Sequence, residues 1–142
     1  FRQRYKFIGF TPQIITLTPF MPDLLFVYDS RKVLDPLVEQ IATLQYRFVK
    51  GGNHQPMTVR NADMERFIRA VDAMNNPCFY TPEEINPDML GKKVRIVGGL
   101  LDGYEGCLQK MQGSRIKRLF VELPNLLTAA VEVQPEFIQV LR

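Results

Sequence analysis

Residues 90–106 read LGKKVRIVGGLLDGYEG, and this stretch decides how the second half of the chain folds. The alternating run Val94–Val97 predicts a strand, which Gly98 and Gly99 end. Glycine adopts left-handed backbone conformations at little cost, so a tight turn is expected there. Gly106 stands inside the next predicted strand, where it would allow two backbones to approach closely at a corner of the sheet.

Short strands separated by turn residues continue from this point to the end of the chain. The expected strands are residues 94–97, 104–111, 116–123, 128–133 and 137–141. Five short strands in so small a segment are typical of a small closed barrel, because closure removes exposed sheet edges. We therefore expect a five-stranded β-barrel over residues 91–142.

Residues 1–73 mix helix and strand patterns and predict an α+β domain. Leu24–Tyr28 is a continuous apolar run that predicts a buried strand, whose alternation puts Leu24 and Phe26 on one face and Leu25 and Val27 on the other. Three further elements are expected: an amphipathic helix that starts at Asp35-Pro36 and carries Leu37, Ile41 and Leu44, a strand over 46–49, and a helix capped by Asn61 with Met64, Phe67, Ile68 and Val71 on its apolar face.

Residues 74–90 carry three prolines and three acidic side chains but no lysine or arginine. Prolines at this density suppress regular structure and stiffen the chain, so we expect an interdomain linker. Within it, Thr81–Glu84 has the pattern of one capped helical turn.

Composition excludes several classes of protein. Of the 142 residues, 46% are hydrophobic and 23% charged, which excludes wholesale disorder. No apolar run approaches the roughly 18 residues of a membrane helix, so no membrane contact is expected. Two distant cysteines fit a reducing cytoplasm better than a disulfide framework. The net charge of +3 permits nucleic-acid or acidic protein partners without demonstrating either.

A catalytic role has little support in the sequence. A thiol hydrolase would need Cys78 or Cys107 beside His54, and no nucleophile motif surrounds any of the three. The acidic residues of 74–90 lack the rigid frame of a metal site. We expect no catalytic residue, no metal and no cofactor.

Residues 90–106 resemble a KOW motif. An α+β domain, a proline-rich linker and a C-terminal KOW barrel, in this order, resemble the NusG family of transcription elongation and antitermination factors, with the closest likeness to the UpxY-like paralogs of Bacteroides-type bacteria. The likeness implies an N-terminal α/β sandwich over 1–73, a linker over 74–90 and a KOW barrel over 91–142. The family's opening Trp-Tyr strand and first helix are not visible, so we expect the first domain to be incomplete at its start.

The resemblance implies a non-catalytic, cytoplasmic factor whose first domain docks on the largest subunit of RNA polymerase. By position, the docking residues are Phe20, Met21, Pro22 and Leu24, where the family's Phe-Pro-Gly-Tyr reads Met-Pro-Asp-Leu. Core packing is an equal alternative for Phe20 and Leu24, whereas exposure is favoured for Met21.

The resemblance also implies that the barrel recruits a second partner, the termination factor Rho or a small-subunit ribosomal protein. The matching turn holds Pro124, Leu126 and Leu127, and we expect one leucine to be buried and the other exposed.

A basic stretch formed by Lys110, Arg115, Lys117 and Arg118 would contact nucleic-acid phosphates rather than bases. An ordinary solvated hairpin is the favoured interpretation. The alternative function is an RNA- or ribosome-binding KOW module without polymerase contact, which would not need the apolar residues 20–24.

Overall fold

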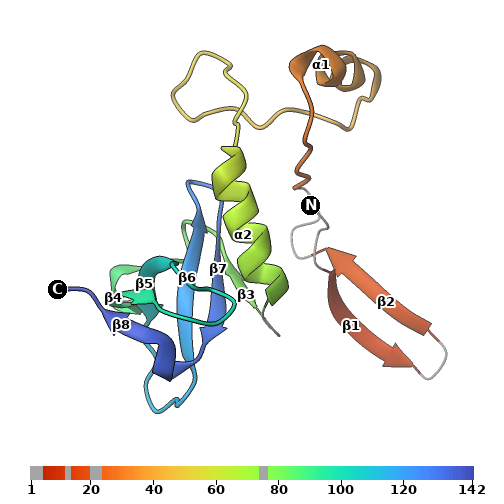
Figure 1. Cartoon of the computed structure of the whole chain (residues 1–142). Coiled ribbons are helices and arrows are strands. Elements are labelled where there is room, and N and C mark those ends of the chain that lie inside the picture. The colour runs from red at the N-terminus through yellow and green to blue at the C-terminus, as the bar shows by residue number, and fades with distance from the viewer. Residues whose placement is uncertain (1–4, 12–13, 20–23, 74–76) are drawn as a thin grey trace. The chain divides into compact units, whose positions relative to one another are not determined.

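The structure is a computed structural model, and it describes residues 5–11, 14–19, 24–73 and 77–142. The chain divides into two compact units, Phe1–Thr58 and Val59–Arg142 (Figure 1). The described residues form two α-helices, a two-stranded hairpin and a six-stranded antiparallel sheet, so the expected mixture of helix and sheet is confirmed. None of the helices in these ranges is both long enough and apolar enough to cross a membrane.

The first unit begins with an antiparallel hairpin that the sequence patterns did not single out. Strand β1 (Tyr5–Thr11) pairs with β2 (Ile14–Pro19), and a bulge interrupts the register between Phe7 and Gly9. Isoleucine and threonine dominate β2, and such β-branched residues favour extended backbone.

Helix α1 (Arg31–Gln40) starts five residues before Pro36, the expected first helical residue, and ends earlier too. Ser30 occupies the N-cap position, and its carbonyl accepts hydrogen bonds from the backbone N–H groups of Val33 and Leu34. Pro36 lies inside the helix instead of opening it. The Asp35 side chain accepts a hydrogen bond from the Tyr46 hydroxyl at 2.7 Å, so this residue ties the helix to the chain that follows.

Two strands expected in the first unit are absent as regular strands. Residues 24–28 have no regular secondary structure, and the expected strand over 46–49 is reduced to a single bridge between Phe48 and Pro56. No side chain within residues 24–58 is buried. An apolar run forms a buried strand only where other elements cover it, and none of the residues that the structure describes buries this segment.

The second unit is built on one curved antiparallel sheet. In chain order its strands are β3 (Cys78–Tyr80), β4 (Leu90–Ile96), β5 (Glu105–Gln109), β6 (Lys117–Leu123), β7 (Leu127–Val133) and β8 (Ile138–Val140). Their order in the sheet is β3-β7-β6-β5-β4-β8. The five strands expected from the sequence are thus present, four of them within about two residues, while β4 begins four residues earlier than expected. The sheet nevertheless has six strands, with β3 and β8 as its edges, where a closed five-stranded barrel was expected.

The core of this unit follows the alternation of β6 and β7. Leu119, Val121 and Leu123 are paired with Val131, Ala129 and Leu127, and all six side chains are buried. From β4, Val94 and Ile96 join this core.

Helix α2 (Asn61–Ala73) packs against β6 and β7 (Figure 1). The expected apolar face is confirmed, since Phe67 and Val71 are buried together with Ala70. Arg66 fastens the helix to the start of β5. Its guanidinium donates a hydrogen bond to the Glu105 carbonyl at 2.6 Å and lies 5.0 Å from the centre of the Tyr104 ring, whose hydroxyl donates to the Arg66 carbonyl at 2.8 Å.

The unit boundary therefore differs from the expected one. Helix α2 was expected within a domain over 1–73, and residues 74–90 were expected to be a linker. Instead α2 covers the sheet, and Cys78–Tyr80 adds the edge strand β3 beside β7. The hydrophobic spacing of α2 identified the face to be buried, but it could not identify the surface that buries it. The expected capped turn at Thr81–Glu84 is present, because the Glu84 carboxylate accepts a hydrogen bond from the Thr81 N–H at 2.7 Å.

Glycines permit two close approaches in the second unit. A Cβ atom on Gly106 would lie 2.8 Å from the Phe120 carbonyl oxygen, so the expected close approach of two backbones is confirmed. Gly98 and Gly99 both have positive φ angles, and the Phe137 ring lies against them. Short 3₁₀ turns at η1 (Pro87–Met89) and η2 (Pro135–Phe137) lead into β4 and β8.

We expect Gly106→Ala to lower the free energy of unfolding by about 3 kcal/mol, because the new methyl group must displace the backbone of β6. The control is Gly113→Ala, where the position is open and only the left-handed backbone is penalised, by about 1 kcal/mol. Urea unfolding of both variants measures the difference, and equal losses would contradict this packing.

Tyr104→Phe removes the hydroxyl hydrogen bond to α2 and should cost about 1 kcal/mol near neutral pH. Burial raises the pKa of Tyr104 above its ordinary value of 10.0, while Arg69 and Arg66 act in the opposite direction. The folded protein therefore keeps this proton to higher pH than the unfolded chain. The contribution of the protonated Tyr104 hydroxyl to the free energy of unfolding is therefore present below pH 10.0, and it is lost as the pH rises through the folded pKa. Urea unfolding above pH 10 should show a steeper loss for wild type than for Tyr104→Phe, and parallel curves would refute the assignment.

Candidate functional site

The polymerase-docking residues expected from the sequence fall mostly beyond what the structure describes. Phe20, Met21 and Pro22 lie outside the described residues, and Leu24 is half-buried. The chain that follows is exposed: Leu25, Val27 and Tyr28 show 62%, 53% and 86% of their surface. The expected alternation thus appears in the exposures, with Leu24 and Phe26 more covered than their neighbours, although no strand forms.

Further apolar surface in the first unit comes from α1 and the chain after it. Val33 and Leu37 on the helix and Ile41 just beyond it are exposed, as are Phe48 and Val49. The sequence predicted an amphipathic helix carrying Leu37, Ile41 and Leu44, but α1 ends at Gln40, so only Leu37 of the three lies on the helix. The described residues of this unit supply no core for these side chains.

The turn expected to contact a second partner has both of its leucine side chains buried. Leu126 and Leu127 are exposed by only 5% and 6%, so the expectation that one of them faces solvent is wrong. Asn125 takes a positive φ of 64°, which asparagine tolerates, and the Leu126 N–H donates to the Leu123 carbonyl. This tight turn directs both leucines into the core and leaves Pro124 and Asn125 exposed.

Leu126→Ala should therefore act on stability, lowering the free energy of unfolding by about 3 kcal/mol through the cavity it leaves. Pro124→Ala, at an exposed position of the same turn, should change it by less than about 0.5 kcal/mol. Thermal or urea unfolding distinguishes the two. A stable Leu126→Ala variant would show that this leucine is available for binding after all.

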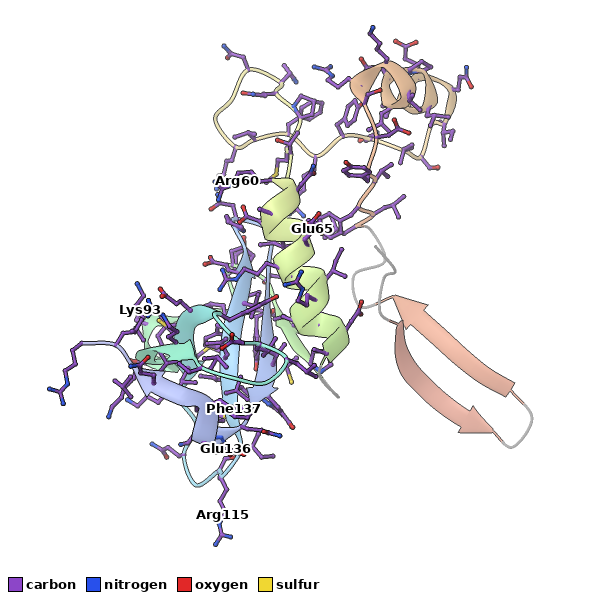
Figure 2. All side chains as sticks on the ribbon, viewed as in Figure 1. Arg60, Glu65, Lys93, Arg115, Glu136 and Phe137 are labelled. Atoms are coloured by element: carbon purple, nitrogen blue, oxygen red, sulfur yellow. The ribbon has the colours of Figure 1, made fainter. Side chains whose placement is uncertain are left out.

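The four basic residues of the expected nucleic-acid site do not share one environment. Lys110, Arg115 and Lys117 are exposed around the loop that joins β5 to β6, and Figure 2 shows Arg115 projecting from the end of this loop. Arg118 is half-buried, and its Nη1 atom donates to the Cys78 sulfur at 3.3 Å. The first three lie in or beside one loop, and the fourth is directed to Cys78 on β3.

The surroundings of Arg118 form a small polar group contributed by β3, β5 and β6. Tyr80 stands edge-on to Phe120 with ring centres 6.0 Å apart, and its hydroxyl accepts a hydrogen bond from the Gln109 amide at 3.0 Å. The Gln109 Oε1 and Arg118 Nε atoms are buried without hydrogen-bond partners. This contact between β3 and β5 spans two intervening strands, which shows how strongly the sheet curves.

The residues considered for chemistry are dispersed. Both cysteines are free, on β3 and β5 of the second unit, whereas His54 belongs to the first unit and packs edge-on against Phe48. Of the acidic residues in 74–90, Glu84 is engaged in the capped turn. Within the described part of the chain, no group of three potential metal ligands is found.

Comparisons with protein-family models, with curated proteins and with solved structures found no match for this chain.

Proposed function

We propose that this chain is a non-catalytic regulator of transcription elongation and antitermination of the NusG-like kind. In this proposal its first unit docks on RNA polymerase and its second unit recruits another protein. The observation that carries the proposal is the exposed apolar run directly after Pro22. Leu25, Val27 and Tyr28 present more than half of their surface to solvent, and large apolar side chains gathered in this way mark protein interaction sites.

The second unit supports the proposal through its topology. Five of its strands lie in the order β8-β4-β5-β6-β7, with a glycine turn after β4 and a close backbone approach at Gly106. Glycines at these two places are those on which the resemblance to a KOW motif was based, and they support the proposal. The additional strand β3 and the covering helix α2 are departures from the resemblance, and both extend the same sheet unit.

Such a factor would act without chemistry. It would bind the elongating conformation of the polymerase more tightly than the paused one and so shift their populations, to an extent limited by that difference in affinity. Phe20, Met21, Pro22 and Leu24 remain proposed contacts, and Leu25, Val27 and Tyr28 extend the docking surface. For the second partner, Rho or a small-subunit ribosomal protein, Pro124 is the exposed apolar residue at the expected turn.

The test is retention of purified bacterial RNA polymerase by the immobilised full chain. Wild type should retain it, and the triple change Leu25→Ser, Val27→Ser and Tyr28→Ser should abolish retention. Each true anchor is worth about 2 kcal/mol, or about 30-fold in affinity. The matched control is Leu100→Ser in the second unit, where an equally apolar side chain is 71% exposed.

Two results would contradict the proposal. One is the absence of retention by the wild-type chain, and the other is an equal loss of retention in the triple variant and in the Leu100→Ser control.

A further inference from the structure

Charge is segregated within the second unit. Residues 59–142 carry eleven lysines and arginines against eleven aspartates and glutamates, so the unit as a whole is neutral. Residues 106–121 nevertheless hold four of the basic residues and no acidic one. The positive charge of this hairpin is therefore a local feature of the molecule and not a consequence of general basicity.

The strand register concentrates this charge at the end of the hairpin. Leu108 is paired with Leu119, and continuing this register places Lys110 opposite Lys117 where the loop begins. Like charges directly opposite one another on paired strands are unfavourable. Arg115 projects from the loop between them (Figure 2). All three side chains are exposed, and no ion pair involving them is present among the described residues.

Nearby carboxylates only partly offset the charge. Glu132 is paired with Arg118, which is half-buried and bonded to Cys78, so Arg118 is not part of the exposed group. Glu136 lies three residues beyond Val133, the partner of Lys117, and is exposed. The hairpin loop from Lys110 to Lys117 thus keeps a net positive charge that the fold does not neutralise.

We propose that this hairpin loop docks on the phosphate backbone of nucleic acid. Lysine and arginine side chains bind phosphate by charge, and neutralising them relieves the repulsion between Lys110 and Lys117. Residues 107–119 contain no aromatic side chain on which a base could stack, so the contact should be independent of base sequence. This surface is separate from residues 24–28, and the inference does not rest on polymerase docking.

An anionic membrane would supply the same phosphate chemistry, but the loop is poorly suited to it. The loop exposes two large apolar side chains, Met111 and Ile116. Binding at a lipid interface scales with the apolar area that is buried there, which two side chains cannot make large.

The experiment measures fluorescence anisotropy of a labelled oligouridylate titrated with the full chain over a series of KCl concentrations. Lys110→Gln with Lys117→Gln should weaken binding and reduce the slope of log K against log salt by about 1.4, as expected for two lost single-strand phosphate contacts. The matched control is Lys92→Gln with Lys93→Gln, which removes the same charge from exposed positions on β4 and should leave the slope unchanged. Glu136→Gln should tighten binding, and oligoadenylate should bind as well as oligouridylate.

Four results would overturn the inference. They are no binding by wild type at low salt, an equal change of slope in the two double variants, weaker binding by Glu136→Gln, and preference for vesicles containing phosphatidylglycerol over the oligonucleotide. Polymerase retention measured on the same hairpin variant should match wild type, so failure here is distinguishable from failure of the proposed function.

Discussion

Strands β6 and β7 pair along their whole length, from Lys117 opposite Val133 to Leu123 opposite Leu127, and this ladder holds the second unit together. Its buried rows pack against α2, β3 adds to β7 along one side, and β5 adjoins β6 on the other. One face of the pair packs against α2, and successive residues of β7 are buried on both faces, so the ladder is covered on both sides. The remaining elements are additions to this two-stranded centre.

The same ladder separates two kinds of surface. At one end of β6 the turn over residues 124–126 is tight and directs its leucines into the core. At the other end the loop over residues 110–117 is longer and keeps its charges in solvent. The apolar exposed side chains of residues 24–58 belong to the other unit. The exposed apolar side chains and the exposed charged loop therefore belong to different units of the chain.

Local signals allowed five of the six strands in the sheet of the second unit to be predicted, but not β3 or the six-stranded arrangement. Alternation in β4 and the glycines around it act over a few residues, so neither depends on distant contacts. The sequence did not predict which elements of the fold pack against each other. The hydrophobic period of α2 predicted that Phe67 and Val71 are buried, but not which sheet buries them. Strand β3 has only three residues, too few to show the alternation of a strand.

Most of the other differences between the predicted and the observed elements arise where two neighbouring sequence patterns suit the same structure. Ser30 and Asp35 both suit a helix N-terminus, and the hydrogen bond between Asp35 and Tyr46, which sequence spacing does not reveal, accompanies the earlier start. The burial of Leu126 followed from a left-handed Asn125 that the turn composition permitted but did not require. Of the candidate site, the grouping of Lys110, Arg115 and Lys117 was foreseeable from the sequence, whereas the diversion of Arg118 to Cys78 was not.

The ring of Phe137 against Gly98 and Gly99 has a consequence for the end of the chain. Val97 donates its N–H to the Phe137 carbonyl, and Leu141 donates to the Lys93 carbonyl, so strand β8 is fastened at both ends to β4. Although β8 has only three residues, the Phe137 ring and these two hydrogen bonds hold it on the edge of β4. An edge covered in this way is not available to pair with a strand of another molecule.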